Sequence, residues 1–158
     1  MMEEITTAIE AYLRPLVENK QGKVFAAEAP DEMEDKFGMV GKNWSVLLCW
    51  EGYEKFEDDP APNTGLQWAR FVFVVEHHSG FQLKRGADIA GFSGLIDLVI
   101  AWLRPLQLKD DAGNNALHGM ELVDTQWIGG DKPWRRHRVI MRAGPMVTAK
   151  NAAMTVQV

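Results

Sequence analysis

Apolar residues near the start of the chain recur with a helical period. One face of a predicted helix, at spacings of three and four residues, is formed by Ile5, Ala8, Ile9, Tyr12, Leu13, Leu16 and Val17. Glu3, Glu4 and Glu10 lie off that face. The pattern predicts an amphipathic helix with a kink or break near Pro15, because the proline ring removes a helical hydrogen bond.

Five later segments have the composition or the alternation of β-strands: 24–28, 44–51, 66–75, 117–128 and 134–143. Segment 44–51 is apolar on both faces, which is typical of a central strand. The last two are joined by the sequence GGDK, which predicts a tight hairpin with Gly130-Asp131 at its apex.

A second amphipathic helix is predicted from Asp88, which can cap it, to about Arg104, before Pro105. Its apolar face comprises Ile89, Phe92, Leu95, Ile96, Val99 and Leu103. Segment 30–43 has the composition of an acidic, irregular connection, and segment 52–65 that of a long polar loop, either functional or mobile.

These elements predict one α+β domain over residues 1–143. We expect a mixed or antiparallel sheet with two amphipathic helices packed on one face and a C-terminal β-hairpin. Residues 144–158 are small and mostly apolar, and they predict an arm or an extra strand. A length of 158 residues, with 46% hydrophobic and 25% charged residues, is ordinary for one globular domain.

Charge and hydropathy narrow the partners that we expect. A formal net charge of -5 makes a nucleic-acid-binding surface unlikely, because such surfaces are basic. No apolar stretch reaches the roughly 18 residues of a membrane span, and the acidic start differs from a signal peptide, so we expect a cytoplasmic protein. Cys49 has no partner for an internal disulfide and lies in an apolar run, which indicates a buried thiol.

No motif in the sequence predicts catalysis, a cofactor or a metal site. The histidines are His77, His78, His118 and His137, and adjacent strand residues such as His77 and His78 point to opposite faces. The GFSG sequence at 91–94 lies inside the second predicted helix rather than at a strand-to-helix turn, so it is not a nucleophile elbow. The acidic pairs 58–59 and 110–111 have the surroundings of solvated loops.

The predicted hairpin is the most informative segment. With Gly130-Asp131 at the turn, the opposed pairs are Trp127 with Trp134, Thr125 with Arg136, Val123 with Arg138, Leu122 with Val139, and Met120 with Met141. The face with Leu122 and Met141 has the composition of a core. The other face would bring two tryptophans beside arginines.

Three interpretations fit that second face. Trp127, Trp134, Arg136 and Arg138 have the composition of a protein–protein hot spot. The same residues suit a base-stacking platform with phosphate contacts. They also suit an edge strand kept soluble by arginines, with the tryptophans packed on a neighbouring loop.

The arrangement of helix 5–17, strands 44–51 and 66–76, the helix ADIAGFSGLIDLVIAWLRPL and the GGDK hairpin resembles that of phage tail proteins. The family comprises the tail-terminator and minor tail proteins of long-tailed phages, including Mu-like prophages. The resemblance implies a non-catalytic protein that forms a homo-oligomeric ring at the head-proximal end of the tail tube. It also implies phage tail-tube or head-completion proteins as partners, first in the bacterial host cytoplasm and then in the virion tail.

Two other functions remain open from the sequence. One is a small non-catalytic protein-binding module, either a monomer or a dimer, such as a toxin-neutralising or chaperone-like protein. The other is a small hydrolase whose site is assembled from residues far apart in the sequence, although no Ser/His, Cys/His or metal constellation indicates it.

Overall fold

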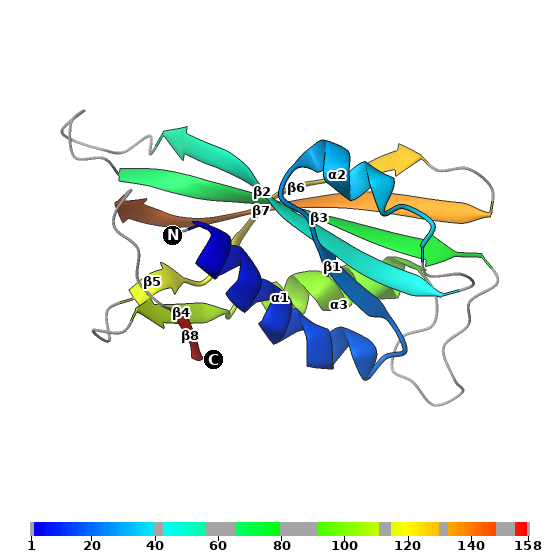
Figure 1. The fold of residues 1–158 in the computed structure, drawn as a ribbon, viewed down its shortest axis with the longest axis horizontal. Coiled ribbons are helices and arrows are strands. Elements are labelled where there is room, and N and C mark those ends of the chain that lie inside the picture. The colour runs from blue at the N-terminus through cyan, green and yellow to red at the C-terminus, as the bar shows by residue number, and fades with distance from the viewer. Residues whose placement is uncertain are drawn as a thin grey trace.

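A mixed five-stranded sheet organises the chain in the computed structural model (Figure 1), which describes residues 2–39, 43–55, 66–79, 92–110, 115–129, 133–147 and 154–157. Its strands, in spatial order, are β1 (Lys23–Ala26), β2 (Trp44–Lys55), β3 (Leu66–His78), β7 (Trp134–Val147) and β6 (Glu121–Gly129). The β1–β2 pair is parallel, and the three other pairs are antiparallel.

A second, antiparallel sheet has the order β5 (Asn115–His118), β4 (Gln107–Asp110) and β8 (Met154–Gln157). Strand β8 comes from the C-terminal segment 144–158, whose first four residues continue β7. Figure 1 shows the small sheet beside the start of the first helix. Strand β4 was not predicted from the sequence, because its segment resembles a polar turn.

Two helices cover one face of the large sheet, as the sequence predicted. They are α1 (Met2–Glu18) and α3 (Phe92–Leu103), and both contribute to one buried cluster with that face. Fully buried members of this cluster include Ile5, Leu13, Trp44, Val46, Phe71, Phe73, Leu95 and Leu103. The α+β class, the mixed sheet and the placement of these two helices are therefore confirmed.

A third helix, α2 (Pro30–Asp35), lies on the opposite face of the sheet (Figure 1). Met33 of α2 is buried against a second cluster that includes Leu47 and Cys49 of β2. The prediction of an irregular connection over 30–43 was wrong here. A helix of six residues is too short to show an apolar period, although Pro30 in its first turn is a common helix start.

Several boundaries differ from the predicted ones. A kink or break was predicted near Pro15; helix α1 continues through Pro15 to Glu18, so there is no break. Strand β2 continues past a bulge near Gly52 as far as Lys55, into the segment predicted as a loop. Gly119, at a φ of 75°, separates β5 from β6 where one strand was predicted.

Other predictions fall outside the described residues: the loop over 56–65, the Asp88 cap, the carboxylates of Asp58, Asp59 and Asp111, and the Gly130-Asp131 turn. The prediction for the adjacent histidines is confirmed. His77 stacks on Phe92 of α3, whereas His78 contacts Trp134 on the other face. Among the described helices, none is long and apolar enough to cross a membrane.

Candidate interaction surface

Strand β6 forms one edge of the large sheet, and it is the most exposed strand for which all side chains are described. Seven of its nine residues are exposed and none is buried. Within the described ranges, no strand pairs with its outer edge. Two of the three large apolar side chains that are most exposed, Trp127 at 59% and Val123 at 40%, lie on this strand. An unpaired strand with exposed apolar side chains is a ready template for another chain.

The observed pairing of β6 with β7 differs from the predicted hairpin register, and β6 contains two irregularities. The pairing shifts between Leu122 and Asp124 and again between Trp127 and Gly129. The observed pairs include Leu122 with Met141, Thr125 with Val139, Gln126 with Arg138, Trp127 with His137 and Gly129 with Arg136. Each irregularity adds one residue to β6, and one added residue reverses which face the following side chains occupy.

The four residues predicted as one interface therefore do not share a face. Trp127 lies on the face covered by α3, where its ring centroid is 5.3 Å from that of Phe92. Trp134 lies on the opposite face and contacts His78 at 4.9 Å between ring centroids. Arg136 and Arg138 alternate with His137 along β7 and share the face of Trp134.

Arg136 is a buried structural residue rather than an exposed contact. Its Nε donates to Oε2 of Glu76 at 2.5 Å, and the Glu76 side chain is fully buried. The guanidinium also lies 4.5 Å from the centre of the Phe37 ring. The other carboxylate oxygen of Glu76 accepts the backbone N–H of Gly38 at 2.8 Å. Together these contacts tie the segment after α2 to the centre of the sheet.

Trp127 and the first turn of α3 border a cavity of about 360 Å³. Its lining comprises Phe92, Ser93, Ile96, Trp127, Arg135 and His137. Burial lowers the pKa of His137, and burial followed by the nearby positive charge of Arg135 lowers the pKa of His77. Both imidazoles are therefore biased toward the neutral form. Of the two, His137 lines the cavity, so its described lining is largely apolar, with the exposed Arg135 as the charged residue among the described ones.

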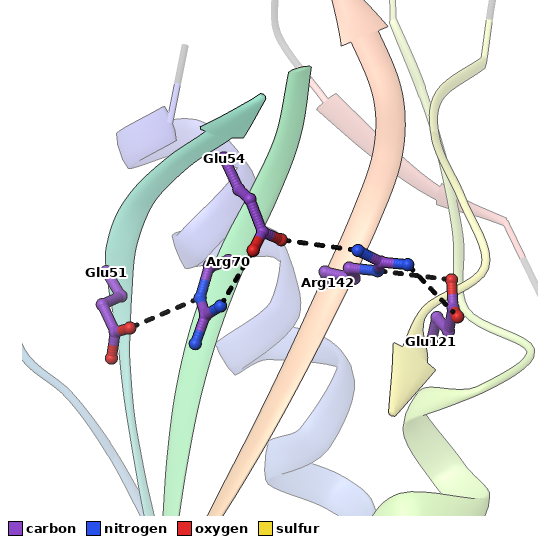
Figure 2. A network of polar contacts seen from close by, with 5 residues as sticks. All are labelled: Glu51, Glu54, Arg70, Glu121 and Arg142. Carbon is purple, nitrogen blue, oxygen red and sulfur yellow. Dashed lines mark hydrogen bonds and ion pairs between the residues drawn. The ribbon is translucent and has the colours of Figure 1, made fainter. Parts of the chain in front are cut away.

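A charge network crosses four strands at the other end of the sheet (Figure 2). Arg70 of β3 contacts Glu51 and Glu54 of β2, at 3.5 and 3.2 Å. Arg142 of β7 contacts Glu54 at 3.5 Å and Glu121 of β6 at 3.4 Å, and its guanidinium lies 4.1 Å from the Trp68 ring centre. The network holds the first residue of β6 to the sheet and leaves the run from Asp124 to Trp127 outside it.

The described residues offer little for nucleophilic or metal chemistry. Cys49 is fully buried, and burial raises the pKa of its thiol to about 11, so the thiol is protonated at neutral pH. No group of three His, Cys, Asp or Glu side chains in the described segments is arranged to hold a metal ion.

Sequence reasoning missed the buried Glu76 and the edge residue Asp124. A carboxylate directly after the apolar run FVFVV was the available signal for Glu76. For β6, the polar sequence ELVDTQ indicated an edge strand.

No protein-family model matches this sequence, and no curated protein matches it significantly. The resemblance to phage tail proteins therefore stays a hypothesis.

Proposed function

We propose that this protein is a structural, non-catalytic assembly protein that self-associates into a ring, of the kind that terminates a phage tail tube. Its partners would then be further copies of itself and tail-tube or head-completion proteins. It would act in the cytoplasm of a bacterial host during assembly and remain in the virion tail.

The single observation that carries this proposal is the outer edge of β6, which no described strand pairs with, together with the exposed Trp127 and Val123 on that strand. Exposed aromatic side chains on an open strand edge favour association with another polypeptide, because main-chain hydrogen bonds and apolar burial are both available there. The ordered, buried ion pair of Arg136 and Glu76 supports a rigid subunit, which suits assembly without refolding.

The experiment is measurement of solution mass by light scattering over a wide range of concentrations. We expect the wild-type chain to exceed 17.8 kDa, the mass of one copy, as concentration rises. Val123→Lys should shift association to higher concentration, because a lysine on an edge strand opposes pairing. Trp127→Ala should weaken association by about 2 kcal/mol, which is roughly thirtyfold, as loss of an aromatic anchor does.

Met39→Lys is the matched control. Met39 is 63% exposed and lies in the segment after α2 rather than on β6, so its replacement should leave the mass unchanged. If Val123→Lys and Met39→Lys behave alike, β6 is not the association surface. If the wild type stays at one copy throughout, the proposed ring is wrong and a monomeric binding module becomes the better description.

A further inference from the structure

The outer edges of the large sheet are β6 and β1, neither of which pairs outward with another described strand, and the topology relates their directions. Strand β1 is parallel to β2, and three antiparallel pairs then separate β2 from β6. Strands β1 and β6 therefore run in opposite directions. If a second copy continues the sheet with its helices on the same face, its β1 lies antiparallel to β6 of the first copy.

We propose, on the basis of the proposed ring, that the occupant of the β6 edge is β1 of a second copy, joined head to tail. When this contact is repeated around a ring, each subunit uses its β6 edge toward one neighbour and its β1 edge toward the other. Pairing of β6 with β6 would instead leave the β1 edge of each subunit without a partner strand. Head-to-tail contacts of this kind generate rings when the rotation between copies closes.

Strand pairing supports this choice of strand. Strand β1 has four residues, Lys23 to Ala26, and among the described residues its backbone is paired only with β2. An antiparallel β1 that begins opposite Asp124 runs along β6 toward Glu121, so it covers the first residues of that strand.

Charge selects the register. Lys23 is exposed and pairs with Ser45, which places it on the α2 face; Asp124 is exposed and pairs with Ile140 on that same face. Neither side chain has an ion-pair partner within the described part of the chain. Setting Lys23 of one copy opposite Asp124 of the next joins opposite charges.

The same register is favourable at the next position. In an antiparallel pair, Val24 of the second copy then lies level with Leu122 and Val123 of the first, so apolar residues face apolar residues. A shift of two residues, the smallest that preserves the faces, would instead place Lys23 opposite Gln126 and leave Asp124 facing Phe25.

Disulfide trapping tests this register directly. Lys23→Cys and Asp124→Cys are made separately, and each is oxidised alone and as an equimolar mixture. We expect a two-chain cross-link in the mixture and in neither variant alone, because directly opposed strand residues lie within disulfide reach. The native Cys49 is fully buried with its thiol pKa raised to about 11, so the wild type should not cross-link.

Gln126→Cys provides the register control. It lies on the same face as Asp124, and with Lys23→Cys it should give much less product than Asp124→Cys does. Equal yields from the two mixtures would overturn the register. Cross-linking of Asp124→Cys alone would show β6 paired with β6 and would overturn the head-to-tail contact.

Solution mass separates this inference from the proposed function. If the wild type assembles but the Lys23→Cys and Asp124→Cys mixture gives no cross-link, the β6–β1 contact is wrong while a self-associating protein still stands. If the wild type remains a single copy of 17.8 kDa at every concentration, both proposals fall.

Discussion

Replacement of Arg136 by Met removes the guanidinium that neutralises a fully buried carboxylate. Arg136 donates to Glu76 at 2.5 Å, and after the substitution Glu76 keeps only the N–H of Gly38 at 2.8 Å among its described partners. Methionine has a flexible apolar side chain that fills much of the vacated space. The experiment therefore isolates charge and hydrogen bonding more than volume.

The magnitude follows from the burial of Glu76. Removing one partner of a buried ion pair typically costs about 3–5 kcal/mol, because the remaining charge is left without compensation. Loss of the contact with Phe37 adds about 0.5–1 kcal/mol. For a domain with a typical stability of about 5–15 kcal/mol, we expect a large fall in the free energy of unfolding.

Urea denaturation of four chains provides the assay: wild type, Arg136→Met, Glu76→Gln and the double variant. Because the double variant leaves no buried charge, it should be more stable than Arg136→Met alone. Arg138→Met is the control, since Arg138 is half-buried on the same face without an ion pair among the described residues, and it should cost about 0.5 kcal/mol or less. A cost below about 1 kcal/mol for Arg136→Met would refute the reasoning.

Three further outcomes are expected. Gly22→Ala should lower stability by about 1–3 kcal/mol in urea denaturation, because its Cβ would lie 2.5 Å from the buried Trp44 ring; an unchanged midpoint would contradict this. Trp134→Ala should lower stability and leave solution mass unaltered, since Trp134 packs on His78; a change in mass alone would return it to the interface. The free energy of unfolding should be highest above pH 6.5 and should fall as the pH drops below that value. Burial lowers the pKa of His137 in the folded state, so the unfolded chain takes up the proton first. His137→Phe should reduce the change in urea midpoint between pH 7.5 and 5.5, with His77 accounting for part of what remains, and an equal change in both chains would exclude His137 as a cause.

The local pattern of the sequence determined much of this protein by itself. The 3.6-residue period predicted α1 and the main part of α3, and apolar runs on both faces predicted a central β2. The helical period and the strand alternation of apolar residues show which side of an element faces the core. Both can be recognised in the sequence without knowing which other element packs there. The opposite placement of His77 and His78 followed from strand geometry alone.

The tertiary structure alone decided the register and the surfaces that depend on it. The irregularity between Trp127 and Gly129 places Trp127 and Trp134 on opposite faces, and long-range pairing with Glu76 makes Arg136 a buried residue. Neither could be read from the hairpin sequence, because an inserted residue leaves composition unchanged while it reverses the face of every later side chain. The positions of β1 and β6 at the two edges of the sheet likewise depend on strand order, which is determined by contacts between residues far apart in the chain.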